Sequence, residues 1–164
     1  MPWDTKRDAL REDASYLVQT SAIDALSAFP GDDTRAAALR PSASRHPLVR
    51  GYAYICVGMA GRSLGDEERA GLRNRLSAIR ETDTFAKICL LESLIHLGDE
   101  TPAAGLIRMF GRCNYRNQCA ILNSLSDVYP EISRSSQGRI RRFCQELADR
   151  DMCAAVQEAY DRLI

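Results

Sequence analysis

Arginine is the residue type in this chain best suited to bind a ligand. Lys6 and Lys87 are the only lysines among its 22 basic residues. The planar guanidinium group of Arg forms paired hydrogen bonds with carboxylate or phosphate groups. The densest local cluster, Arg139, Arg141 and Arg142, therefore predicts a site for an acidic group. The alternative for this cluster is a solvated charged helix face, and a genome whose high GC content favours Arg codons would account for the excess of Arg over Lys.

A second candidate contact site is the segment Tyr115-Arg116-Asn117, which opens a predicted helix. Arg112 and Asn114 lie in the loop just before it. Tyr and Arg are enriched among the residues that dominate the binding energy of protein interfaces, so we expect partner contacts here. The alternative is that Tyr115 packs against the start of the helix and that Arg116 is simply solvated.

Residues for catalysis or metal binding give a weaker signal. His46 precedes a predicted helix, and His96 lies near the end of an apolar one. Gly98 separates His96 from Asp99, which disfavours a coupled pair. The six cysteines include no CxxC pair, and the chain has no phosphate-binding glycine loop and no GxSxG motif. We expect no enzyme, metal or cofactor, although a Cys–His pair formed only by the fold stays open.

Composition predicts a single domain spanning residues 1–164. A chain of 164 residues can bury a core without disulfides or metals, and 45% hydrophobic with 27% charged residues is ordinary for a globular protein. The 22 basic and 22 acidic residues balance, so no overall field attracts nucleic acid or a membrane. Without an apolar leader or a membrane-length apolar stretch, the sequence predicts a cytoplasmic protein with reduced, packed thiols.

Helical periodicity and helix-capping residues run through nearly the whole chain. Apolar residues recur at three- and four-residue steps, and no clear strand pattern appears. Short loops suggest four antiparallel helix pairs plus a closing helix, with no linker to a second domain. The predicted helices cover 4–29 (one helix or two), 33–39, 48–60, 65–79, 84–97, 103–110, 115–128, a span ending at 147 that starts at 133, 135 or 136, and 151–163.

Short segments of the chain repeat at a period in the low thirties. The order apolar, acidic or amide, small, Leu occurs at Ile23-Asp24-Ala25-Leu26, Leu91-Glu92-Ser93-Leu94 and Leu122-Asn123-Ser124-Leu125, and more weakly at Val57-Gly58-Met59-Ala60. Such a period is typical of stacked helical repeats, in which each unit buries its apolar face against its neighbours. The sequence therefore predicts an all-α solenoid.

Two junctions resemble those of HEAT repeats, which belong to the HEAT/armadillo class. His46-Pro47-Leu48-Val49-Arg50-Gly51-Tyr52-Ala53 is similar to the start of their first helix, and Asp83-Thr84-Phe85-Ala86-Lys87-Ile88 repeats it with the basic residue displaced by one. Leu97-Gly98-Asp99 resembles the turn that ends a first helix. The resemblance spans about residues 8–150. It implies a right-handed α-α superhelix of about nine helices, whose second helices line the concave side.

Charge segregates along the predicted helix pairs. The turns within the pairs are acidic, whereas the second helices and their flanks are rich in Arg. One interpretation is helix electrostatics, because acids near helix N-termini and bases near C-termini each stabilise by about 0.3–1 kcal/mol. The other is a basic groove with an acidic rim, shaped for an acidic partner. The acidic turns are Asp32-Asp33, Asp66-Glu67-Glu68, Asp99-Glu100 and Glu131.

Helical-repeat folds mostly bind other macromolecules, so the predicted function is a non-catalytic, monomeric protein-interaction module. A compact solenoid without motifs is also similar to small immunity proteins that block bacterial toxins, which makes a toxin domain a candidate partner. The alternative is nucleic-acid binding through an Arg-rich concave face, as in HEAT-like alkylpurine glycosylases. The predicted partner-binding residues are Arg73, Arg108, Arg112, Tyr115, Arg116, Arg139, Arg141 and Arg142.

Overall fold

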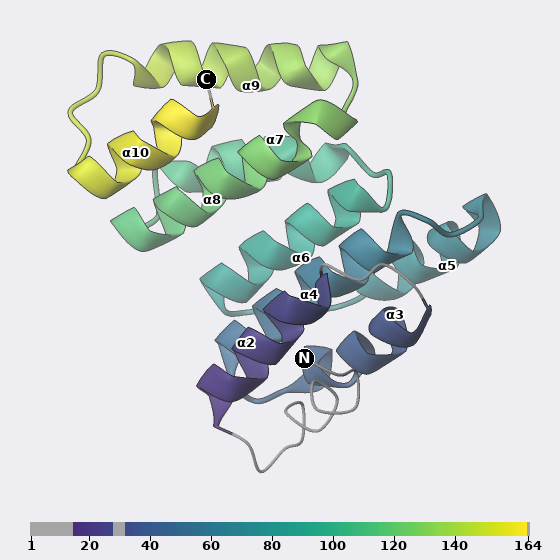
Figure 1. Ribbon diagram of the computed structural model, residues 1–164. Helices are drawn as coiled ribbons and strands as arrows, with labels where there is room; N and C mark the ends of the chain where they lie inside the picture. Colours follow the sequence, from purple (N-terminus) through teal and green to yellow (C-terminus); the bar gives the residue numbers. More distant parts are fainter. Residues whose placement is uncertain (1–14, 28–31, 164) are drawn as a thin grey trace.

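A computed structural model describes residues 15–27 and 32–163 of the chain (Figure 1). These residues form α-helices and short 3-10 turns with no strand among them, which confirms the all-α prediction. The part of the predicted first helix before residue 15 lies outside them. The elements are α2 (Tyr16–Ser27), α3 (Asp32–Leu39), η1 (Pro41–Ala43), α4 (Pro47–Gly61), α5 (Asp66–Ser77), α6 (Thr84–His96), α7 (Thr101–Phe110), α8 (Tyr115–Val128), η2 (Tyr129–Glu131), α9 (Arg134–Leu147) and α10 (Ala154–Leu163).

Local capping interactions place the helix ends where the sequence predicts them. Asp83, Asn114 and Ser133 each accept a hydrogen bond from the backbone N–H three residues later, at 3.0, 3.0 and 3.3 Å. These bonds satisfy N–H groups that have no partner inside the first helical turn. Gly98 follows α6 with φ of +90°, the left-handed conformation that glycine adopts without steric cost.

Two predicted helix boundaries differ from the structure. The last helix begins at Ala154 rather than at Asp151. The predicted helix 65–79 ends at Ser77, and Ile79 lies beyond it, 36% exposed. His46, which the sequence places just before a helix, occupies the N-cap position of α4. It makes no capping hydrogen bond, and its ring stacks on that of Tyr16 at 3.9 Å between centroids.

The helices pack in serial order along the molecule. α2, α4, α6, α8 and α10 each contact the next member of that series, so the chain progresses from α2 in the lower part of Figure 1 to α10 in the upper part, below α9. The helices between them pack on the flanks: α3 on α4, α5 on α6, and α7 on α6, α8 and α9. Contacts between alternate helices are the more extensive ones, whereas the sequence grouped consecutive helices into pairs.

Helix α6 belongs to both hydrophobic clusters of the described residues. Ile88 and Ile95 join the cluster shared with α7–α10, while Cys89 and Leu94 join the one shared with α2–α5. Its side chains are buried almost all round, including the polar residues near its end. α6 is therefore the helix around which the two halves of the core are organised.

Three glycines let α4 approach α6 closely, and one of them, Gly58, lies against the backbone of α6. A Cβ atom on Gly58 would lie 2.7 Å from the Cα of Ser93, closer than real Cβ contacts come. Cβ atoms on Gly51 and Gly61 would meet the side chains of Phe85 and Leu97 at 2.7 and 2.5 Å. The partners advance along α6 as the glycines advance along α4, so the two helices run parallel.

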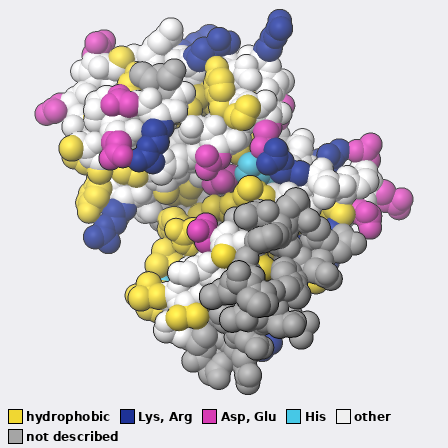
Figure 2. All heavy atoms as spheres, viewed as in Figure 1, with side chains coloured by type: hydrophobic (Ala, Val, Ile, Leu, Met, Phe, Trp, Pro, Cys, Tyr) yellow, Lys and Arg dark blue, Asp and Glu magenta, His cyan; other side chains and the backbone are white. Residues whose placement is uncertain are grey.

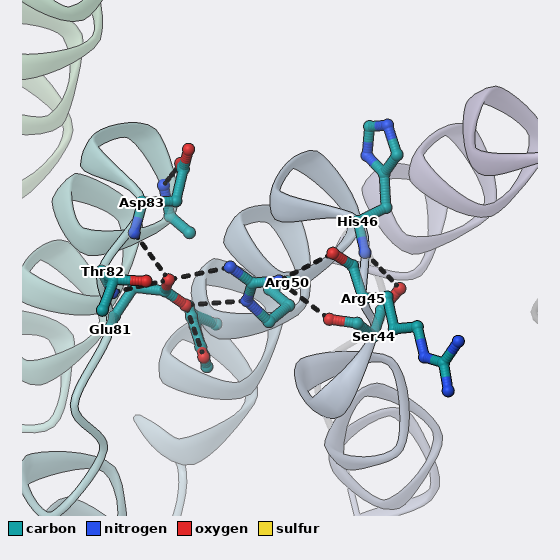
Figure 3. Close-up of polar contacts among 9 residues, drawn as sticks. Ser44, Arg45, His46, Arg50, Glu81, Thr82 and Asp83 are labelled. Carbon is teal, nitrogen blue, oxygen red and sulfur yellow. Dashed lines mark hydrogen bonds and ion pairs between the residues drawn. The ribbon is translucent and has the colours of Figure 1, made fainter.

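A network around Glu81 joins the start of α4 to the loop before α6 (Figure 3). Arg50 donates from Nε and Nη2 to the two carboxylate oxygens of Glu81, each at 2.8 Å. The Arg50 Nη1 group also donates to the carbonyls of Ser44 and Arg45, at 2.9 and 3.1 Å. Tyr54 adds a hydrogen bond to Glu81 at 3.1 Å. The hydrogen bonds from Arg50 outweigh burial and lower the pKa of Glu81 to about 2.

Several polar contacts between elements join residues 31 to 36 positions apart. They are Arg50–Glu81 (31 positions), Ser124–Glu92 (32), Ser133–Glu100 (33), His96–Glu131 (35) and Ser126–Arg162 (36). Other contacts between elements have different separations, among them Tyr54–Glu81 (27) and Arg73–Leu97 (24), and Arg62–Glu131 spans a much longer interval.

Replacing Gly58 by Ala is expected to lower the free energy of unfolding by about 1–3 kcal/mol, because the added methyl group overlaps the Ser93 backbone. The matched control is Gly71→Ala in α5, where a Cβ meets nothing within 4 Å. Helix propensity alone should make that control more stable by about 0.5–1 kcal/mol. Urea denaturation measures both variants, and equal stability of the two would contradict the close α4–α6 contact.

Acid should weaken the fold through Glu81. Because the folded pKa of about 2 lies below the ordinary 4.5, the ionised carboxylate stabilises the fold above pH 4.5. That contribution, about 3 kcal/mol, is lost as the pH falls from 4.5 toward 2. Glu81→Gln should therefore flatten the pH dependence of unfolding in this window, measured by denaturant titration. Glu67→Gln, at an exposed position, should leave the pH dependence unchanged.

Candidate functional site

An open groove of about 390 Å³ lies between α4, α6 and α8. α4 contributes Tyr52 and Ile55, and Phe85 and Cys89 of α6 lie between them and the wall formed by α8. Figure 2 shows hydrophobic side chains gathered in the hollow between the α8–α10 part and the α2–α4 part, with acidic side chains beside them. The helices that line this groove are thus α4, α6 and α8, the first helices of the predicted pairs.

The wall from α8 carries polar residues at helical spacing. Arg116, Ala120, Asn123 and Asp127 line the groove at steps of four, three and four residues, which places them on one helix face. Arg116 and Asp127 are eleven residues apart, or about 16 Å along an α-helix. The groove therefore has a cation at one end of this wall and a carboxylate at the other.

The floor of the groove is neutral. The rings of Tyr52 and Phe85 lie 6.0 Å apart between centroids and are tilted by 50°. Burial raises the pKa of Tyr52 and, more strongly, that of the Cys89 thiol. Burial also raises the pKa of Cys119 on the α8 wall. These groups stay protonated near neutral pH, so the thiols are poor nucleophiles.

A buried polar cluster closes the Asp127 end of the groove. His96 Nδ1 lies 2.9 Å from Glu131 Oε2, and His96 Nε2 lies 3.6 Å from Glu92 Oε1. Arg62 at the end of α4 forms an ion pair with the other Glu131 oxygen at 2.8 Å. Ser124 of α8 donates to Glu92 at 2.5 Å. The cluster thereby ties α4, α6, α8 and η2 together at one point.

Carboxylates control the charge of this cluster. Burial of the His96 imidazole opposes protonation, but its contacts with Glu92 and Glu131 outweigh burial and raise the His96 pKa above its ordinary value. Burial, followed by the charge of Glu92, raises the pKa of Asp127. Asp127 has no ion-pair or hydrogen-bond partner among the described residues. It is the carboxylate of the groove that a ligand can reach.

The cluster does not have the order of a nucleophilic triad. A serine nucleophile needs an imidazole against its hydroxyl and a carboxylate behind the imidazole. Here the Ser124 hydroxyl donates to the Glu92 carboxylate, and His96 lies beyond Glu92. Ser124 is also only 3% exposed. Within residues 15–27 and 32–163, no group of three or more His, Cys, Asp or Glu side chains is arranged to hold a metal ion.

Of the predicted partner-binding residues, Arg116 is the one that lines the groove. Its Nε donates to the hydroxyl of Tyr115 at 3.1 Å, and its guanidinium carbon lies 5.8 Å from the centre of that ring. Tyr115 is 50% exposed, so it is not packed away against the helix start. This pair forms one exposed surface at the mouth of the groove.

The other predicted arginines lie away from the groove. Arg73 on α5 donates to the carbonyl of Leu97 at 3.5 Å, at the C-terminal end of α6 where a cation is favoured. Arg139 on α9 donates to Ser136 at 3.1 Å. Arg141 lines a separate hollow of about 350 Å³ between α9 and α10. Arg108, Arg112 and Arg142 are exposed on α7, the following loop and α9.

Sequence reasoning missed most of the groove. Asn123 and Asp127 follow Arg116 at the spacing of one helix face, a signal that was present in the sequence. Glu92 and His96 are four apart in one helix, which could also have indicated their contact. Glu131 lies 35 residues from His96, so no local pattern indicated their contact. Asp99, three residues from His96, was therefore the acidic residue considered as its partner.

Replacing Glu131 by Gln should lower the His96 pKa, because it removes a carboxylate 2.9 Å from the ring. A proton NMR titration of the imidazole measures this change. Since the folded pKa of His96 is raised, its pairing stabilises the fold below the ordinary pKa of 6.5 and weakens as the pH rises through the folded value. The matched variant Asp99→Asn should leave the titration unchanged, and an equal shift in both variants would contradict the assignment.

Comparison of the chain with family models, curated proteins and solved structures finds no match. No helix among residues 15–27 and 32–163 has the length and apolar character needed to cross a membrane. The function is therefore inferred from the groove itself.

Proposed function

We propose that this protein is a HEAT-like α-solenoid that binds another protein through the groove between α4, α6 and α8, without catalysing a reaction. The observation that carries the proposal is an open groove with an aromatic floor and an unpaired charge at each end of its α8 wall. Preformed concave sites with a few placed polar groups are the usual form of a binding site.

The solenoid part of the proposal is supported by the serial packing. Alternate helices contact one another in chain order, α4 and α6 run parallel, and polar contacts recur at 31 to 36 residues. In a repeat protein each unit contacts its neighbours, so a group of contacts at similar intervals is expected. A right-handed superhelix of the HEAT type accounts for this interval.

A protein partner fits the groove better than nucleic acid does. Tyr52, Phe85 and the Tyr115–Arg116 pair are residue types enriched at protein interfaces. Glu92 and Asp127 also line the groove, and their negative charge opposes a phosphate backbone. A toxin domain with a basic active-site cleft would be a partner of this kind, in line with the resemblance to immunity proteins.

A non-catalytic, intracellular role also suits the side chains present. Both ring nitrogens of His96 face carboxylates rather than a nucleophile. All six cysteines are free thiols, as a reducing compartment such as the cytoplasm would keep them.

The proposal is tested by affinity capture from the source organism with groove and control variants. Asn123→Trp fills the groove and should reduce recovery of the dominant partner at least about tenfold, because side chains of the partner can no longer enter it. Asn123→Ala keeps the groove open and should retain the partner. The triple variant Arg139→Ala, Arg141→Ala, Arg142→Ala should retain it too, since these residues lie away from the groove. Quantitative mass spectrometry reports recovery, and circular dichroism confirms that each variant is folded.

Two results would overturn the proposal. If the triple Arg variant loses the partner while Asn123→Trp retains it, the binding surface lies on α9 and not in the groove. Tight binding of a labelled oligonucleotide that weakens steeply between 50 and 200 mM salt, and disappears in the triple Arg variant, would assign the protein to nucleic acid.

A further inference from the structure

We infer that the groove selects a segment of a protein partner with apolar side chains flanked by one acidic and one basic group, the two charges about 16 Å apart. The inference rests on the proposed function, because it names the chemistry of the segment that the groove binds. It follows from the charges at the two ends of the groove and the neutral surface between them.

The Asp127 end favours a cation. Asp127 lines the groove beside Glu92, and neither an ion pair nor a hydrogen bond to the Asp127 carboxylate occurs among the described residues. The nearby cations are already engaged: Arg62 with Glu131 at 2.8 Å, and His96 between Glu131 and Glu92. A Lys or Arg side chain of a partner would give Asp127 the partner that it lacks within the fold.

The Arg116 end favours an anion. The guanidinium of Arg116 is exposed and donates to the neutral hydroxyl of Tyr115, with no carboxylate at ion-pair distance among the described residues. The remaining donors of its planar group are open to a carboxylate of the partner, which can accept two of them at once. The half-exposed Tyr115 ring beside it offers an apolar contact to the same residue.

The surface between the two ends is uncharged and mostly apolar. Ile55, Phe85 and Ala120 line it, the Tyr52 and Cys89 groups there are neutral, and Asn123 adds one neutral polar side chain. Burial of apolar side chains in this part contributes most of the binding energy, and the two charges fix register and select the partner. About five residues of an extended segment, or eleven of a helical one, cover the distance between the charges.

A displayed library of random sixteen-residue peptides is the probe for this inference. Peptides selected on the wild-type protein should carry an acidic and a basic residue on opposite sides of an apolar core. They should bind Asn123→Trp at least about tenfold more weakly, because that variant fills the groove.

Charge reversal at either end provides the decisive comparison. Arg116→Glu makes both ends acidic and should select peptides with basic residues on both sides of the apolar core. Asp127→Lys makes both ends basic and should select peptides with acidic residues on both sides. Each reversal should weaken a wild-type-selected peptide about five- to tenfold, measured by fluorescence anisotropy. The matched control Arg142→Glu reverses an exposed charge on α9 and should change neither selection nor affinity.

The inference fails if wild-type peptides show no charge pattern, or if both reversed variants select the same peptides as the wild type. It also fails if the selected peptides bind Asn123→Trp normally. Failure of the inference differs from failure of the proposed function. One combination of results separates the two. If only Asn123→Trp loses the native partner and the selected peptides show no charge pattern, the groove binds protein by apolar contacts alone.

Discussion

The close approach of α4 and α6 is the constraint on which the rest of the structure depends. Gly58 lies against the backbone of Ser93 without room for a Cβ atom, so the distance between the two helices is set by backbone contact. Packed interiors tolerate little change in volume, and a fixed contact of this kind also fixes the rotation of each helix. Tyr52 of α4 and Phe85 of α6 consequently face the same side and form one floor.

Polar contacts then join segments that are far apart in the sequence. Arg50 and Glu81 join the beginning of α4 to the loop before α6, and Glu100 accepts hydrogen bonds from Ser133 and Ser136 near the start of α9. The Glu81 carboxylate is largely withdrawn from water, where an unpaired charge would be costly. These contacts leave one side of α4, α6 and α8 open as the groove.

The groove and the arginine-rich surfaces make different use of charge. Arg73 and Arg139 bind groups of the protein itself, and Arg73 does so at the C-terminal end of α6, which agrees with the interpretation of helix electrostatics for that position. Arg116 and Asp127 instead lie at opposite ends of the α8 wall, with Ala120 and Asn123 between them, and the polar cluster around His96 lies next to the acidic end. The groove therefore presents two opposed charges rather than a uniformly basic face.

The sequence alone determined the helices, because helix ends depend on residues within four positions of one another. Asp83, Asn114 and Gly98 could be assigned as helix-end residues for this reason, and the all-α class followed from the same local signals. The tertiary structure decided the groove and the His96–Glu131 contact. Those features depend on the distances between packed helices. These distances are set by the volumes of side chains from segments about 35 residues apart, which pack against one another only in the folded chain.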